Sequence, residues 1–391
     1  MKQLSKIMLA AVASVALAAP AFAWDFGASG SSSATFKQAT SAPAEGDATT
    51  TANFTSSAGG VTVSSSNSDG ANSATFSYTA DWNGDAGNFD EYVTVSGSKK
   101  VGNWTASSST SQYMQKDVIA GDANIAGGSK PMSAGGTAAI TLTDGSITYK
   151  LGDAAHLSTA EKTSGGPMGG AQDAEASVDS FNGFSVGLGV GPGTLTVALD
   201  MHDNSADGAA TVLGETQASA IGATGCGAQM TGFGFNFAGD VGADLTFTYG
   251  SGSATISEAG CTGDNATNAW GYSVMGLGVA VPVGDMTIAI DYGSKVALWT
   301  NATVEGGTAT AGWEISLVMP VGDASAGVNL SSTATIGTTA GVAGDAAGTG
   351  GTELWYTVPI GPVSLSAGYG SAAVVDGTTT TEIGAEMSLS F

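Results

Sequence analysis

The chain has 391 residues, only 11% of them charged, and its 34 acidic residues outnumber its 10 basic ones, which gives a formal net charge of −24 at pH 7. The basic residues are all lysines, and this balance excludes nucleic acid as a partner, because neutralising phosphates needs clustered Lys and Arg. The 60 glycines and the many Ser, Thr and Ala residues favour strands with one small polar face. A disordered chain is the alternative, and the regular apolar alternation argues against it.

The N-terminus has the pattern of a secretory signal. Two lysines precede an apolar run over residues 7–19, and a small-x-small cleavage site ends at Ala23. We expect residues 1–23 to be removed and residues 24–391 to form the mature protein. The apolar run is shorter than the roughly 20 residues that a transmembrane helix needs.

The region 38–88 contains two strand-like segments, 54–66 and 74–82. An acidic stretch follows them and ends with Glu91. Its hard oxygen ligands could gather divalent cations loosely, although a solvated loop explains the same residues, and we expect no cofactor or dedicated metal site. The stretch consists of Asn83, Asp85, Asn88, Asp90 and Glu91.

Two further segments resemble known sequences. Residues 92–104, Tyr-Val-Thr-Val-Ser-Gly-Ser-Lys-Lys-Val-Gly-Asn-Trp, are similar to the second and third strands of the general porins of Gram-negative bacteria around a charged turn. Residues 139–152, Ala-Ile-Thr-Leu-Thr-Asp-Gly-Ser-Ile-Thr-Tyr-Lys-Leu-Gly, resemble their fourth and fifth strands. The match covers about 27 residues, and the strand and turn rhythm extends it over most of the mature chain.

The resemblance implies an all-β fold, a transmembrane antiparallel β-barrel with short periplasmic turns and long external loops. Counting from these segments to Phe391 gives sixteen strands, and the region 38–88 leaves eighteen possible. The general porins are homotrimers that contact outer-membrane lipid, so the same assembly and location are implied here.

The resemblance also implies that residues 153–179 are an inward-folded constriction loop. Its candidate channel residues are Asp153, His156, Glu161, Lys162, Asp173, Glu175 and Asp179. One feature departs from the family, because the arginine row that general porins place opposite this loop is absent. The resemblance therefore does not imply the transverse field of the family for this chain.

From residue 181 onward, two-faced strands alternate with tight turns and long polar loops, as in outer-membrane barrels. The turns are Gly191–Gly193, Ala238–Gly242, Pro282–Asp285, Pro320–Asp323 and Pro359–Pro362. The loops are expected near 203–228, 256–268, 295–308 and 337–351.

Alternation assigns several charged residues to the polar face of these strands, which would be the lumen of a barrel. The pore-lining candidates are Lys150, Asp200, Asp291, Glu314, Glu353, Glu382 and Glu386. Since most of them are acids, they predict a channel that prefers cations.

The two cysteines, Cys226 and Cys261, fall in two successive loop-like stretches. An exported chain meets an oxidising compartment, so we expect a disulfide between them, with two free thiols as the alternative.

One motif is typical of hydrolases. Residues 183–187 read Gly-Phe-Ser-Val-Gly and match the G-x-S-x-G nucleophile elbow, with His156 and His202 as the available bases. The elbow requires a helix after the serine, and no helix-forming stretch follows Ser185. We therefore expect no enzyme, with an outer-membrane enzyme as the alternative.

The C-terminal residues 381–391 alternate strictly between apolar and polar, over the 9 to 11 residues that a tilted transmembrane strand needs. Ile383 and Met387 fall on the apolar side. Ending on Phe391, the segment resembles the C-terminal signature of Gram-negative outer-membrane barrels, which implies that it closes the barrel against the first strand. A solvent-facing strand of a soluble sandwich is the alternative.

Together these features predict an outer-membrane porin, a water-filled channel for passive diffusion of small hydrophilic solutes and ions. The alternative is a secreted β-rich surface or adhesin protein, which would be released into buffer without detergent.

Overall fold

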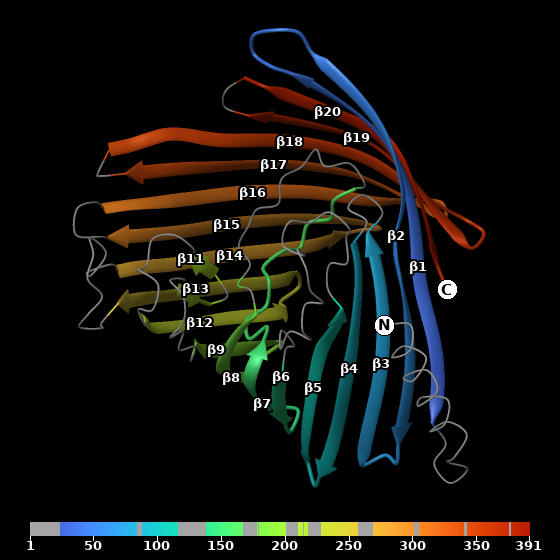
Figure 1. The fold of residues 1–391 in the computed structure, drawn as a ribbon, viewed down its shortest axis with the longest axis vertical. Coiled ribbons are helices and arrows are strands. Elements are labelled where there is room, and N and C mark those ends of the chain that lie inside the picture. The colour runs from blue at the N-terminus through green and yellow to red at the C-terminus, as the bar shows by residue number, and fades with distance from the viewer. Residues whose placement is uncertain are drawn as a thin grey trace, which may run out of the picture. The chain divides into compact units, whose positions relative to one another are not determined.

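The computed structural model describes residues 24–83, 88–115, 138–166, 178, 180–200, 210–213, 215–217, 228–256, 269–300, 305–339, 342–374 and 377–391. These residues form strands and connections, with no helix among them (Figure 1). No helix in the described part of the chain is long and apolar enough to cross a membrane.

The first nine strands are β1 (Asp25–Ala42), β2 (Thr49–Ser68), β3 (Asn72–Asn83), β4 (Asn88–Val101), β5 (Trp104–Gln115), β6 (Ala138–Thr143), β7 (Ile147–Ala154), β8 (Phe181–Val190) and β9 (Gly193–Asp200). A small hairpin follows, made of β10 (Ala210–Val212) and β11 (Glu215–Gln217).

The remaining strands are β12 (Ala228–Asp240), β13 (Asp244–Ile256), β14 (Ala269–Val283), β15 (Met286–Thr300), β16 (Glu305–Val321), β17 (Ala324–Thr339), β18 (Val342–Ile360), β19 (Val363–Val374) and β20 (Thr379–Ser390). Eighteen of the twenty strands form one sheet, and β10 pairs only with β11.

Neighbouring strands of the large sheet run antiparallel, and β9 pairs with β12 across the small hairpin. β1 pairs with both β2 and β20, so the ladder of hydrogen bonds closes on itself. The fold is therefore an antiparallel β-barrel, as the sequence predicts, and the described residues give it eighteen strands, the second of the two counts that the sequence left open. The difference is the hairpin of β2 and β3 in the region 38–88, where the sequence left an extra hairpin possible.

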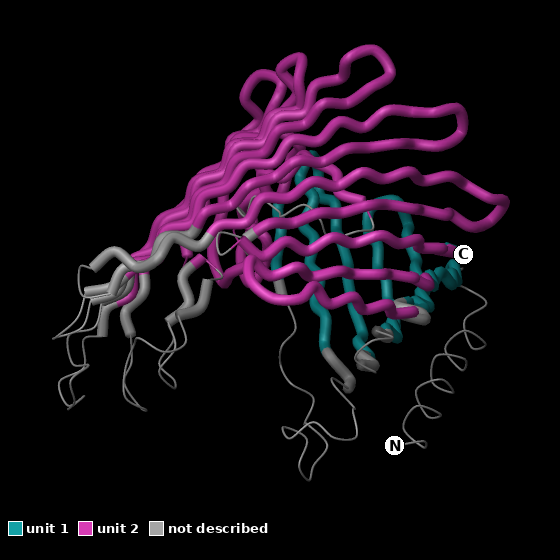
Figure 2. Tube along the Cα trace, turned by 90° about the horizontal axis from the view of Figure 1, so that it is seen from above, with its two compact units in different colours: residues 1–32, 58–142, 390–391 teal, residues 33–57, 143–389 magenta. Residues whose placement is uncertain are grey.

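The chain divides into two compact units, coloured separately in Figure 2. Unit 1 comprises residues 1–32, 58–142 and 390–391, and unit 2 comprises residues 33–57 and 143–389. The candidate functional site described below lies within unit 2.

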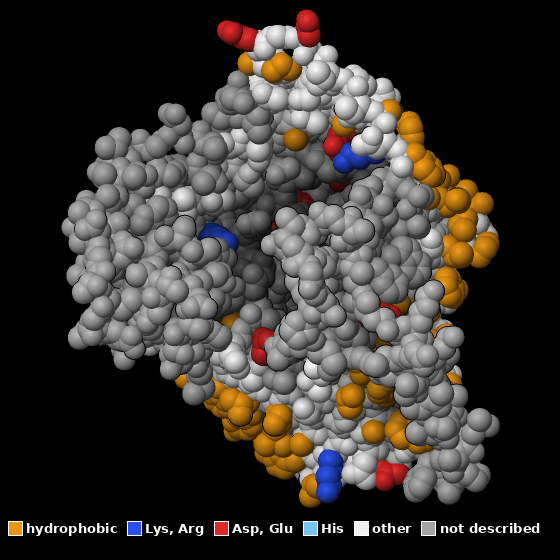
Figure 3. Space-filling view, in the orientation of Figure 1, with side chains coloured by type: hydrophobic (Ala, Val, Ile, Leu, Met, Phe, Trp, Pro, Cys, Tyr) orange, Lys and Arg blue, Asp and Glu red, His pale blue; other side chains and the backbone are white. Residues whose placement is uncertain are grey.

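In the strands of unit 2 large apolar side chains are exposed and polar side chains are buried, which is the reverse of a sheet in a soluble protein. On β15, Ile290 and Tyr292 are 48% and 38% exposed, whereas Asp291 between them is 3% exposed. The same order holds on β16, where Trp313 and Ile315 are exposed and Glu314 is buried. Large apolar side chains gather along the outer margins of the space-filling view (Figure 3).

The predicted tight turns are confirmed. Each contains a glycine with positive φ, which L-residues with a Cβ avoid. These glycines are Gly191, Gly242, Gly284, Gly322 and Gly361. The expected loops at 295–308 and 337–351 are wrong in extent, because β15 to β18 run well into both ranges.

The C-terminal strand confirms the expected closure. β20 pairs with β19 and β1, and its residues Ile383 and Met387 are both more than half exposed. Directly after β20, Phe391 exchanges two backbone hydrogen bonds with Gly30 of β1, at 2.7 and 3.0 Å.

Gly284 is a position where the positive φ of a tight turn can be tested without steric effects. Its φ is 63°, and a Cβ added there would meet no atom within 4 Å, so only backbone strain would oppose a side chain. We expect Gly284→Val to lower the free energy of unfolding by about 1–2 kcal/mol. Gly284→Asn should cost less, because Asn tolerates the left-handed region. Urea unfolding of the refolded protein checks this, and equal stabilities for both variants would contradict it.

Candidate functional site

The candidate site is the inner face of unit 2 together with the segment 155–166, which leaves β7 and lies along this face. The segment contacts successive strands by hydrogen bonds and close packing. It therefore occupies the polar side of the sheet and covers side chains that would otherwise face water.

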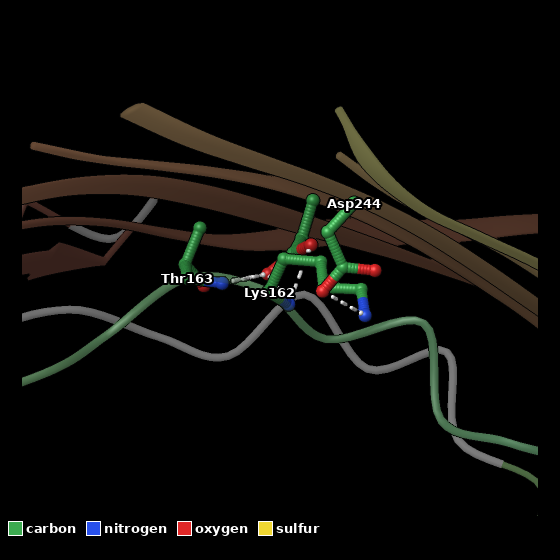
Figure 4. A network of polar contacts seen from close by, with 4 residues as sticks. Lys162, Thr163 and Asp244 are labelled. Atoms are coloured by element: carbon green, nitrogen blue, oxygen red, sulfur yellow. Dashed lines mark hydrogen bonds and ion pairs between the residues drawn. The ribbon is translucent and has the colours of Figure 1, made fainter. Parts of the chain in front are cut away.

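The central contact is made by Asp291 of β15, whose carboxylate accepts several hydrogen bonds from two adjacent loop residues (Figure 4). The backbone N–H of Lys162 lies 2.9 and 2.8 Å from Oδ1 and Oδ2. The backbone N–H and the hydroxyl of Thr163 each donate to Oδ2 at 2.7 Å. Two successive backbone N–H groups can bind an anion together, and here the anion is the carboxylate of Asp291.

Lys162 makes a further contact in Figure 4. Its Nζ donates to Oδ2 of Asp244 at 2.9 Å, and the Asp244 side chain is 58% exposed. Because this ion pair is partly open to solvent, it contributes less to the loop position than the buried Asp291 contacts.

Beyond Asp291 the segment continues across β16 to β18. The backbone N–H of Ser164 donates to the hydroxyl of Ser316 at 3.2 Å. Asn329 donates from Nδ2 to the carbonyl oxygen of Ser164 at 3.4 Å and also to Glu314. The backbone N–H of Gly166 then donates to Glu353 Oε2 at 2.8 Å.

Register explains why these side chains meet. Asp291 pairs with Glu314 across β15 and β16, and Asn329 of β17 pairs with Ser316 on one side and Glu353 on the other. Paired residues on neighbouring strands share a face of the sheet. The inner wall under the segment is therefore a continuous polar strip.

Glycines make room for the segment where it crosses β12 and β14. A Cβ added at Gly278 would overlap the carbonyl oxygen of Ala160, and one at Gly234 would overlap the side chain of Leu157. Leu157 and Ala160 are 4% and 2% exposed. The segment thus packs directly against the backbone of these glycines, which excludes water from this part of the wall.

The start of the segment is held by His156 at β8. The His156 Nδ1 lies 2.9 Å from the Ser185 hydroxyl, and Nε2 lies 2.9 Å from the carbonyl oxygen of Gly152. The fold thus brings together the serine and the histidine of the hydrolase motif. Ser185, however, is 3% exposed in the middle of β8, with no strand-to-helix turn after it. A nucleophile elbow needs an exposed serine, so this pair is a buried structural contact.

A second inward element is the hairpin of β10 and β11. The backbone N–H of Leu213 donates to Asp200 Oδ2 at 2.6 Å, and Leu213 itself is 1% exposed. A Cβ added at Gly250 would contact the Leu213, Val274 and Val178 side chains. A small apolar cluster therefore lies on the inner side of β13 and β14.

The structure locates four of the predicted pore-lining acids on the inner face, yet each is at most 9% exposed: Asp200, Asp291, Glu314 and Glu353. They bind backbone and side-chain groups of the inward segments and the wall, so little of each side chain is open to solvent. The alternation of apolar and polar residues predicts the face of the sheet on which these acids lie. The segments that cover the acids come from elsewhere in the chain.

The other predicted pore-lining residues are half-buried. Glu382 of β20 forms an ion pair with Lys37 of β1 at 2.6 Å, and Glu386 accepts a hydrogen bond from Thr35 at 3.0 Å. Lys150 donates from Nζ to the carbonyl oxygen of Ala155 at 2.8 Å.

Among the predicted loop residues, Asp153 is the last but one residue of β7, Glu161 is exposed, and Lys162 binds Asp244. Several predictions fall outside the described residues, namely those on Asp173, Glu175, Asp179, Cys226, Cys261, His202 and Asp85. In the part of the chain that the structure describes, no three His, Cys, Asp or Glu residues come together to hold a metal ion.

Sequence reasoning missed Asn329, Thr163 and Lys37. Asn329 could have been found, because it alternates with the apolar Val328 and Leu330 on a two-faced strand. Thr163 carries no such signal, since its role comes from the course of the segment.

Comparison with solved structures gives matches over nearly the whole chain. An anion-selective porin from Comamonas acidovorans is 12% identical, with 94% of this chain and 100% of that chain covered and a TM-score of 0.51. OmpT, an outer membrane protein of Vibrio cholerae, is 8% identical, with 94% and 100% covered and a TM-score of 0.49. The outer membrane channel DcaP of Acinetobacter baumannii is 10% identical, with 94% and 97% covered and a TM-score of 0.49.

No protein-family model matches the chain, and no curated protein sequence does. Of the three structures, the Comamonas porin alone exceeds a TM-score of 0.5, and at its identity the likeness concerns the fold. The chain therefore has the fold of an outer-membrane porin, as the sequence resemblance implies.

Asp291 provides a direct test of the loop attachment. We expect Asp291→Ala to lower the free energy of unfolding by about 2–4 kcal/mol, because the part-buried N–H of Lys162 and the buried N–H of Thr163 would lose their acceptor. Amide hydrogen exchange at these two residues should rise in parallel. Asp285→Ala, which removes an exposed acid in a tight turn, is the matched control and should change stability by no more than about 0.5 kcal/mol. Equal effects of the two substitutions would contradict the assignment.

Proposed function

We propose that this protein is an outer-membrane channel of the porin type, through which small hydrophilic solutes and ions diffuse passively. The observation that carries the proposal is that the sheet exposes its apolar side chains and buries its polar ones. Large apolar side chains such as Leu199, Ile290 and Trp313 are 42–50% exposed, while the polar residues between them are buried. Lipid contact accounts for exposed apolar strands, whereas water would penalise them.

Export by a signal in residues 1–23, location in the outer membrane of a Gram-negative bacterium, and assembly as a homotrimer belong to the same proposal. The N-terminal sequence pattern and the resemblance to general porins support them. A closed sheet also fits this location, because a strand edge left open in lipid would leave backbone groups without partners.

Cation preference is the finer part of the proposal. The chain carries a net charge of −24 and no arginine, and Glu161 is exposed on the inward segment. The wall acids Asp291 and Glu353 contribute less than open carboxylates would, because backbone N–H dipoles surround them. The Comamonas porin is described as anion-selective, so this chain would differ from it in preference.

Lysine substitutions on β20 test the membrane location. Met387→Lys would place a charge on the lipid face and should cost about 2–4 kcal/mol if the residue lies near the membrane centre. Ser388→Lys, on the opposite face of the same strand, is the matched control and should fold normally. Folding yield into lipid vesicles, read from heat-modifiable gel mobility, compares the two. Equal yields, or release of the wild-type protein into buffer without detergent, would instead favour a secreted β-rich protein.

The reversal potential in a KCl gradient tests the selectivity. We expect a potential that shows preference for K⁺ and that weakens as salt rises, since the Debye length is about 8 Å at physiological ionic strength. Glu161→Gln should reduce the preference, and Asp285→Asn in a tight turn should reduce it less. A preference for chloride would contradict cation selectivity, and an absence of conductance would contradict the channel itself.

A further inference from the structure

Lys99 lies on the apolar face of β4, two residues before the strand ends at Val101. The hydroxyls of Ser73 and Ser98 bond each other at 2.8 Å on one face of the sheet, so Lys99, the next residue after Ser98, faces the other side. On that side Val95 and Val101 are 49% and 65% exposed. Lys99 is therefore a charged residue on a face that otherwise exposes apolar side chains along β4.

Trp104 begins β5 on the same face. Register pairs it with Val101, and paired residues on neighbouring strands share a face of the sheet. Trp104 is 37% exposed. Figure 3 shows basic side chains beside apolar ones at the lower end of the view, where Figure 1 places the turn between β4 and β5. Lysine and tryptophan near the end of a spanning strand are typical of the level at which lipid headgroups meet hydrocarbon.

Lys99 and Lys100, here called the basic patch, carry charges that the described residues do not neutralise. Within the described residues neither ammonium forms an ion pair or a side-chain hydrogen bond, whereas the other described lysines each have a partner. Asp69 lies in the adjacent turn between β2 and β3, but its carboxylate accepts from the backbone N–H and the side chain of Asn72, at 2.6 and 2.8 Å. The basic patch is thus open to an anion from outside the chain.

We propose that the basic patch and Trp104 bind the headgroup of an anionic phospholipid, whose acyl chains lie along the exposed valines of β4. The inference rests on the membrane location in the proposed function. An anionic phospholipid offers a phosphate to the ammonium groups and hydrocarbon to the apolar side chains beside them. A free phosphate ion would satisfy the first requirement only.

The depth of Lys99 fits this partner. Two residues, at about 3.3 Å each, separate it from the end of the strand, and a lysine side chain can extend along apolar surface to reach the headgroups. A charge on the lipid face costs little at this depth, whereas it costs much at the membrane centre. The chain as a whole has a net charge of −24, so its attraction for an anionic lipid is confined to the basic patch.

Quenching of tryptophan fluorescence by brominated lipids tests the site in the full-length protein, refolded into phosphatidylcholine vesicles. Brominated phosphatidylglycerol is compared with brominated phosphatidylcholine, each as a minor component of the vesicle. We expect phosphatidylglycerol to quench at the lower mole fraction, because it gathers beside Trp104. Trp104→Phe should remove this difference. A difference that persists in Trp104→Phe would place the lipid elsewhere and overturn the proposal.

Three lysine variants test the charge. Lys99→Gln should lower the preference for phosphatidylglycerol about fivefold, the contribution of one lysine near an anionic surface. Lys100→Gln should lower it less, because Lys100 starts from the opposite face of the strand. Lys295→Gln is the matched control, since the ammonium of Lys295 lies over the Tyr272 ring on other strands, and it should leave the preference unchanged. The preference of the wild type should weaken as salt rises.

The outcomes separate this site from the proposed function. Equal quenching by the two lipids, or an equal loss of preference in all three lysine variants, would overturn the headgroup site and leave the channel unaffected. Equal quenching together with a smaller oligomer in Lys99→Gln would assign the basic patch to a contact between copies of the chain, which also overturns the proposal. No quenching by either lipid would contradict the membrane location, and both proposals would then fail.

Discussion

A carboxylate buried in a wall of strands needs hydrogen-bond donors, and the inward segment of this protein supplies them. Asp291 takes backbone donors from Lys162 and Thr163, and Glu353 takes one from Gly166. The relation is mutual, because a loop lying inside a barrel also needs acceptors for its backbone N–H groups. Wall and segment therefore satisfy each other's buried polar groups.

This arrangement depends on the sheet having its apolar side chains outside and its polar side chains inside. Strict alternation directs apolar side chains to one face and leaves the other face polar, so the inner wall can bind a loop backbone by hydrogen bonds. Glycines such as Gly278 bring the segment directly against the strands. The acids that a sequence pattern assigns to the lumen then become attachment points, and the charges facing water are fewer than the composition suggests.

The Ser185 and His156 pair shows that solvent exposure decides whether a serine and a histidine in contact can act as a hydrolase site. The two side chains lie within hydrogen-bond distance, as in a hydrolase, but both are at most 4% exposed and the second ring nitrogen binds a backbone carbonyl. Burial also lowers the pKa of His156, because the charged imidazolium would lose its contact with water.

The sequence by itself determined the strand faces, the tight turns and the closing role of β20, because these follow from local alternation, glycine conformation and strand length. The tertiary structure decided what covers each face. Asp291 and Lys162 are 129 positions apart, and no local pattern relates them. The count of eighteen strands also required the structure, because β2 and β3 are rich in small residues, whose alternation is weak. A period of two assigns a side chain to a face, whereas its partners depend on the path of distant segments.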